Sequence, residues 1–105
     1  MVVETTITVI VQPYSWISNT LGMPDEAGSV INKKVKAGTS LNSLLVELAN
    51  SYPEFRNLVF DPETGKMSDQ ALIILNSKLI QYGEINEIIL NDKDNITLAP
   101  VIFGG

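Results

Sequence analysis

The sequence predicts an α+β fold in which a mixed sheet of four to five strands packs against one main helix on one face. Two local patterns support this prediction: residues 5–12 are β-branched almost throughout, and leucines recur at helical spacing from position 41. The third observation is the order of elements, because further apolar stretches follow the helix at 71–75 and 96–99. The helix then serves as a crossover, so we expect the first and last strands to pair in parallel at the sheet centre.

Residues 5–12 are expected to form the first strand. Its two-residue alternation places three apolar side chains on one face: Ile7, Val9 and Val11. Pro13 ends the strand, and the segment 13–29, with two prolines and two glycines, is predicted to be a long hairpin connection. Three residues of this connection are expected to pack beneath the sheet: Trp16, Ile17 and Leu21.

Residues 30–35 are predicted to form the return strand of the hairpin. Two of its residues are expected to face inward, namely Ile31 and Val35. Three lysines are interpreted as a solvated edge that discourages pairing with other sheets: Lys33, Lys34 and Lys36. Docking of an acidic partner is the alternative for these lysines.

The strongest periodic signal is an amphipathic helix that begins after Thr39-Ser40. Its apolar face comprises Leu41, Leu44, Leu45, Leu48, Ala49 and Tyr52. Thr39 or Ser40 supplies the N-cap oxygen, and Pro53 ends the helix because the residue before a proline disfavours the α region. Glu47 is the only side chain of the helix that is charged at neutral pH. We therefore expect this helix to build the core and to carry no catalytic group.

The segment 53–60 is expected to form a short helical turn with three side chains facing inward: Phe55, Leu58 and Phe60. The sequence 61–65, Asp-Pro-Glu-Thr-Gly, is typical of a turn, since Pro favours its second position and Gly its end. Two carboxylates in this turn suggest a metal site, but nothing nearby in the sequence supplies further ligands. We therefore expect a solvated turn and no metal.

The remaining strands follow this turn. The continuous apolar run 71–75 is expected to lie inside the sheet and to be covered on both faces. The connecting segments are a turn at 76–77, an edge segment at 78–81, an apolar stretch at 85–90 and a polar turn at 91–95. The last strand is 96–99, and Pro100 ends its row of backbone donors. A hairpin, then a helix, then further strands is the order of elements typical of a β-grasp, ubiquitin-like roll.

The composition limits what the chain can do. Its 105 residues are consistent with a single domain over 1–105, and seven basic against twelve acidic side chains give a net charge of −5. This charge disfavours nucleic acid, because phosphate neutralisation dominates such binding. The lack of Cys and His excludes disulfides, iron–sulfur ligation, imidazole-zinc sites and Ser-His-Asp catalysis. No basic leader or membrane-length apolar run is present, so we expect a cytoplasmic protein without membrane contact.

The predicted site is the apolar tail 100–105, Pro-Val-Ile-Phe-Gly-Gly. Two residues without Cβ make a thin, flexible thread whose reactive group is the α-carboxylate of Gly105. Phe103 is expected to be exposed and to anchor the tail in a hydrophobic groove of a partner. An apolar patch is likewise expected on the sheet beside the tail.

Several segments together carry a family resemblance. They are the helix from Gly38-Thr39-Ser40-Leu41 to Tyr52-Pro53-Glu54, the pair Leu75-Asn76, the turn and strand Leu90-Asn91-Asp92-Lys93-Asp94 and Ile96-Thr97-Leu98, and the proline-containing Gly-Gly tail. With these the chain resembles the MoaD/ThiS family of ubiquitin-like sulfur carriers, and it resembles MoaD more closely because Pro100 lies in the tail. Four residues depart from the family pattern: Ser77 and Lys93 replace glycines, Val101 replaces a second proline, and Phe103 is bulkier than usual.

The resemblance implies a carrier with no catalytic side chain and no bound cofactor of its own. An ATP-dependent activating enzyme adenylates the Gly105 carboxylate, and sulfur transfer then makes a thiocarboxylate. The large subunit of a molybdopterin synthase, a MoaE-like protein, accepts the tail and takes the sulfur for molybdenum or tungsten cofactor biosynthesis. The residues implied to enter that subunit are Pro100, Val101, Ile102, Phe103 and Gly104.

Three alternatives stay open at this point. A ThiS-type carrier would deliver its sulfur to the thiazole precursor of thiamine. A ubiquitin-like modifier would be joined through Gly105 to lysines of other proteins. A β-grasp interaction module would carry the Gly-Gly ending by coincidence.

Overall fold

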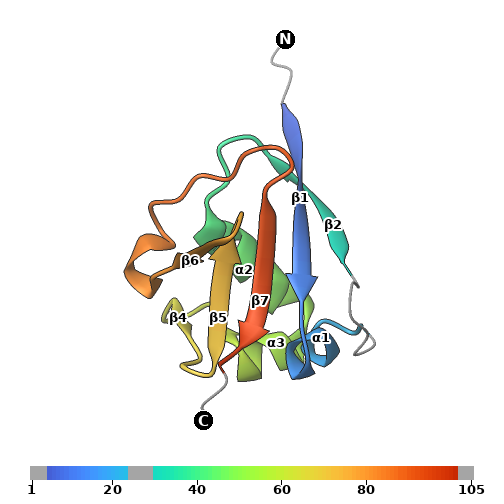
Figure 1. Cartoon of the computed structure of the whole chain (residues 1–105), viewed down its shortest axis with the longest axis vertical. Helices are drawn as coiled ribbons and strands as arrows, with labels where there is room; N and C mark the ends of the chain where they lie inside the picture. Colours follow the sequence, from blue (N-terminus) through green and yellow to red (C-terminus); the bar gives the residue numbers. More distant parts are fainter. Residues whose placement is uncertain (1–4, 24–29, 102–105) are drawn as a thin grey trace.

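The computed structural model describes residues 5–23 and 30–101. In this part of the chain one mixed sheet has the strand order β2-β1-β7-β5-β6 (Figure 1). The strands are β1 (Thr6–Pro13), β2 (Ile31–Lys36), β5 (Ala71–Leu75), β6 (Lys78–Ile80) and β7 (Asn95–Pro100). β1 and β7 pair in parallel at the centre, with Ile10 opposite Asn95 and Pro13 opposite Leu98. The predicted fold class and the parallel central pair are confirmed.

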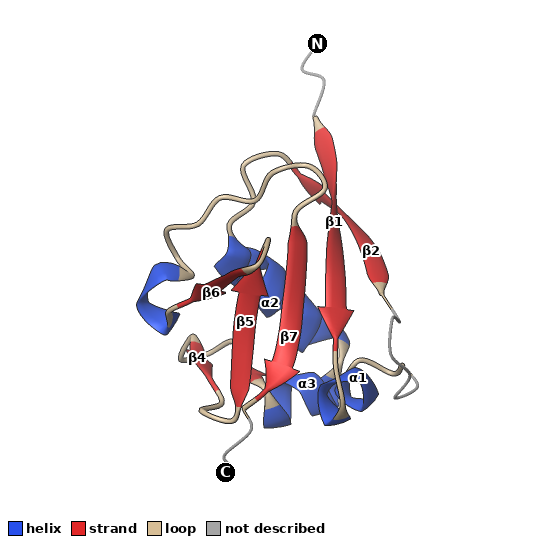
Figure 2. Cartoon of the chain, viewed as in Figure 1, coloured by secondary structure: helices blue, strands red, loops and turns tan. Residues whose placement is uncertain are grey.

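Helix α2 (Leu41–Ser51) crosses one face of this sheet (Figure 2). Ser40 caps it, because the Ser43 N–H donates to Ser40 Oγ at 3.1 Å. Tyr52 has extended geometry, with φ −128° and ψ 101°, so the helix ends before Pro53 as predicted. The helix buries Leu41, Leu44, Leu45, Leu48 and Ala49 against a sheet face that contributes Val9, Val11, Ile73, Ile96 and Leu98.

Two short helices lie at the end of the sheet where β7 finishes (Figure 1). α3 (Pro53–Leu58) follows α2 directly, and α1 (Trp16–Thr20) lies within the segment that was predicted only as a hairpin connection. Ser15, with φ 58°, redirects the chain into α1. The expected burial of this connection is confirmed for Ile17 and Leu21, which are fully or almost fully buried, while Trp16 is half-buried against the core.

The end of α3 corrects one predicted core residue. Phe55 and Phe60 are buried as expected, but Leu58 is exposed and Val59 is buried instead. Leu58 is the last helical residue, and Val59 has left helical geometry with φ −121° and ψ −54°. The change of backbone direction turns the side chain of Val59 inward and leaves that of Leu58 outside.

The strand β5 corrects a second prediction. It lies inside the sheet, between β7 and β6, as expected. However, it is not covered on both faces: Ala71 and Ile73 are buried, whereas Leu72 and Ile74 are only partly buried. Both neighbours of β5 are antiparallel to it, and such a sheet can leave one face open to solvent. The outer face of the sheet is therefore an accessible surface.

The two strands predicted at the edges of the sheet lie there, but one of the predicted edge lysines contacts α2. β6 and β2 are the two edge strands. Lys34 and Lys36 are exposed on the edge strand β2, whereas Lys33 is partly buried and its Nζ lies 2.8 Å from Glu47 Oε1 on α2. The stretch predicted without a type, 85–90, follows a 3₁₀ turn (Tyr82–Glu84) and buries Ile85 and Leu90.

Candidate functional site

The predicted tail begins at the end of the central strand β7. Pro100, the last residue of β7, lies opposite Ala71 of β5. The Val101 N–H then donates to the Gln70 carbonyl oxygen at 2.9 Å, and Val101 is half-buried. Backbone pairing with neighbouring segments thus continues as far as Val101. β1 pairs with β7 as far as Leu98, whereas β5 continues to Pro100, so the end of β7 is held on the β5 side.

The structure places two of the six predicted site residues, Pro100 and Val101. The other four, Ile102, Phe103, Gly104 and Gly105, lie outside the described residues. Their roles as the reactive end and the partner-binding tail stay predictions.

An apolar patch lies on the outer face of the sheet next to β7. Strand register places Leu72 opposite Ala99, and Ile74 opposite Leu79. Leu79 is 49% exposed, and the other three are partly buried. We call Leu72, Ile74, Leu79 and Ala99 the outer patch. The sequence suggested a patch beside the tail but not its members, because the face of β5 that stays open depends on where the helices pack.

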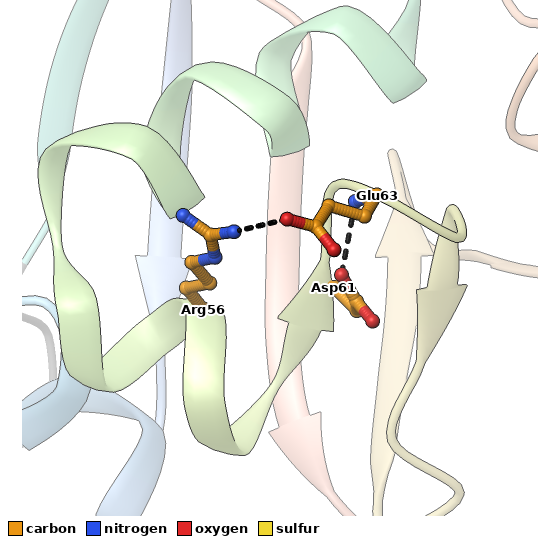
Figure 3. A network of polar contacts seen from close by, with 3 residues as sticks. All are labelled: Arg56, Asp61 and Glu63. Atoms are coloured by element: carbon orange, nitrogen blue, oxygen red, sulfur yellow. Dashed lines mark hydrogen bonds and ion pairs between the residues drawn. The ribbon is translucent and has the colours of Figure 1, made fainter.

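The turn between β3 (Phe60–Asp61) and β4 (Lys66–Met67) is a polar network without metal geometry (Figure 3). Arg56 Nη2 donates to Glu63 Oε1 at 2.9 Å, and the Glu63 N–H donates to Asp61 Oδ1 at 2.9 Å. This backbone hydrogen bond is the main cause that holds the pKa of Asp61 below its ordinary value. Within 5–23 and 30–101, no three His, Cys, Asp or Glu side chains cluster in a way that could hold a metal ion.

The described part of the chain also contains no helix that is long and apolar enough to cross a membrane.

The fold defined by this sheet, its crossover helix and its parallel central pair is the ubiquitin-like β-grasp fold. Scans against protein-family models and against curated proteins find no match. Solved structures do match over nearly their full length. SAMP1 from Haloferax volcanii has a TM-score of 0.70 at 16% identity, over 93% of this chain and 99% of that one.

Two further structures extend the comparison. The "Putative molybdopterin converting factor, subunit 1" from Pyrococcus furiosus has a TM-score of 0.68 at 18% identity, over 91% of this chain and 99% of that one. Urm1 from Trypanosoma brucei has a TM-score of 0.67 at 22% identity, over 98% of this chain and 100% of that one. At these identities the likeness establishes the fold.

Proposed function

We propose that this protein is a ubiquitin-like sulfur carrier that supplies sulfur for molybdopterin, the pterin of the molybdenum and tungsten cofactors. The observation that carries the proposal is the path of β7. This central strand leads directly into a short apolar tail that ends in Gly104-Gly105. The fold shared with the Pyrococcus protein supports a role in molybdopterin synthesis, because the name of that protein refers to molybdopterin conversion.

The chemistry centres on the carboxylate of Gly105. An ATP-dependent activating enzyme joins a carboxylate oxygen to the α-phosphate of ATP and releases pyrophosphate. A sulfur donor at the oxidation level of hydrosulfide then attacks the acyl carbon, AMP leaves, and a thiocarboxylate remains. The nucleotide supplies the activation, so the carrier needs no catalytic side chain.

The geometry of the tail suits delivery into a buried site. Six extended residues from Pro100 span roughly 20 Å at about 3.3–3.6 Å each. A narrow tunnel admits glycine backbone more easily than residues with a Cβ. In this proposal the MoaE-like large subunit of the synthase accepts the tail, Phe103 binds a hydrophobic groove of that subunit, and the outer patch rests on its surface.

Intact mass spectrometry tests the proposal. The protein is incubated with ATP, a sulfur source and its activating enzyme, and its mass should rise by the replacement of one oxygen by sulfur. Deletion of Gly105 should abolish this rise. The matched control is Gly83→Ala, because a Cβ there meets no atom within 4 Å; this variant should be thiolated normally. Thiolation of the Gly105 deletion would overturn the proposal.

A protein modifier is the second candidate, and the likeness to SAMP1 favours it because a second structure of the Haloferax protein names it a small archaeal modifier protein. In that role Gly105 would form an amide with lysines of other proteins. A ladder of heavier conjugates that depends on Gly105 would support it. A ThiS-type carrier would instead yield thiolated protein that a thiazole synthase consumes and a molybdopterin synthase does not.

A further inference from the structure

A hollow lies at the end of the sheet where the tail begins. Its lining residues are Trp16 of α1, Asn57 and Leu58 of α3, and Ser68 and Gln70 of the β4–β5 loop. We call it the tail hollow. The two short helices and the end of β7 lie at the same end of the molecule (Figure 2). The hollow is thus formed by α1, α3 and the β4–β5 loop.

One backbone hydrogen bond connects the tail to this hollow. Gln70 lines the hollow, and its carbonyl oxygen accepts from the Val101 N–H at 2.9 Å. The tail therefore leaves the sheet from the rim of the hollow. Phe103 is only two residues further on, so its Cα lies within about 7 Å of the Val101 Cα. Phe103 is therefore close enough along the chain for its aromatic side chain to reach the hollow.

The lining of the hollow suits an uncharged apolar side chain. Leu58 is 54% exposed, the largest exposed fraction among the large hydrophobic residues of the described chain. Trp16 adds a half-buried aromatic ring, and the remaining lining residues are amides and a hydroxyl. Aromatic pairs gain from offset or edge-to-face contact in addition to the burial of their area. Ile102 and Phe103 are uncharged and apolar, which matches this lining.

We propose that Phe103 docks in the tail hollow against Trp16 and Leu58 when no partner is bound. The protein then covers its own exposed leucine, and the Gly105 carboxylate is held near the end of β7. A partner that takes up the tail exchanges this contact for its own groove. The contact is independent of thiocarboxylation, so the proposal stands or falls separately from the function proposed above.

Trp16 reports on this contact directly, because it is the only tryptophan of the chain. In the isolated protein, Phe103→Ala should shift Trp16 emission to longer wavelength and raise its quenching by acrylamide. The matched control is Ile89→Ala, since Ile89 is 52% exposed and does not line the hollow; it should leave both readings unchanged. Circular dichroism checks that each variant is folded. Unchanged emission and quenching in folded Phe103→Ala would overturn the proposal.

A second measurement follows the tail itself. Carboxypeptidase should release Gly105 faster from Leu58→Ala than from the unaltered protein, because the tail has lost its apolar contact. Leu58 is exposed, so this variant is expected to fold. Equal release rates would count against the docked tail. If the difference in Trp16 quenching between Phe103→Ala and the unaltered protein vanished on dilution, the occupant would be a second copy and the intramolecular proposal would be wrong.

Discussion

Asn76 Nδ2 donates a hydrogen bond to Asp94 Oδ1 at 2.8 Å and so joins two turns that are 18 residues apart. The other carboxylate oxygen of Asp94 accepts from the Asn91 N–H at 2.7 Å. The side-chain oxygen of Asn76, Oδ1, in turn accepts a hydrogen bond from the Asn95 N–H at 2.8 Å. Asp94 is 7% exposed. These bonds hold the start of β7 against the β5–β6 turn and thereby set the strand that leads to the tail.

Replacing Asp94 by Ala should lower the free energy of unfolding by about 1–3 kcal/mol, because the Asn76 amide and the Asn91 N–H lose their buried acceptor. Urea denaturation of the purified protein measures this change. Asp69→Ala is the matched control, since Asp69 is exposed, and it should stay within about 0.5 kcal/mol. Equal effects of the two substitutions would show that the Asp94 bonds add no stability.

Ser77→Gly should stabilise the protein. Asn76 and Ser77 have φ of 50° and 72°, as in a two-residue turn that favours Asn-Gly. A non-glycine residue in this region costs about 1–2 kcal/mol. Because glycine also has more freedom in the unfolded chain, the expected gain is only about 0.5–1 kcal/mol. Thermal unfolding measures it. Ser77→Ala keeps the strained backbone and should bring no gain; a gain from Ala equal to that from Gly would contradict the explanation.

Asp61 should make stability depend on pH in the acid range. Its pKa is lowered, first by the Glu63 N–H and further by Thr64 and Arg56. The folded protein thus binds this proton less readily than the unfolded chain does. The Asp61 contribution is complete above the ordinary carboxyl pKa and is lost as the pH falls through the lowered one.

The measurement compares Asp61→Asn with the unaltered protein by urea denaturation at decreasing pH. Asn keeps an acceptor for the Glu63 N–H but has no charge to titrate. The stability advantage of Asp61 should therefore shrink as the pH falls. An advantage that grows toward acid would reverse the assigned direction of the pKa shift.

Leu79→Ser should weaken binding to the proposed MoaE-like subunit without unfolding the carrier. Leu79 is half-exposed in the outer patch, so its own contribution to folding is small. Loss of an apolar anchor at the centre of an interface raises Kd by about tenfold or more. Calorimetry with the purified subunit measures Kd, and Ile89→Ser is the matched control outside the sheet. If both variants bound as tightly as the unaltered carrier, the outer patch would not be the interface.

Much of the fold could be predicted because its signals are local. The leucine spacing of α2, the β-branched run of β1 and the turn at 61–65 each lie within a dozen residues. The parallel pairing of β1 with β7 followed from the crossover rule, which needs only the order of elements. The start of the tail was expected at the sheet centre for the same reason, because this order of elements places the last strand beside the first.

Other features depended on contacts between distant segments. The helix α1 has only five residues, and the positive φ of Ser15 that starts it leaves no sequence signal. Leu58 and Val59 are neighbours of similar hydropathy, and only the end of α3 decides which one is buried. The bond between Asn76 and Asp94, the outer patch and the tail hollow all require strands and helices to be placed first.

The sequence by itself therefore determined the class of fold and the apolar, glycine-containing composition of the segment after the last strand, because periodicity and turn residues are visible in adjacent positions. The tertiary structure decided which side chains surround the beginning of that tail. Packing of α2 on one face leaves Leu72 and Ile74 open on the other, and the placement of α1 and α3 brings Trp16 and Leu58 to the rim where Val101 leaves the sheet. Such neighbours are far apart in the chain, so only folding brings them together.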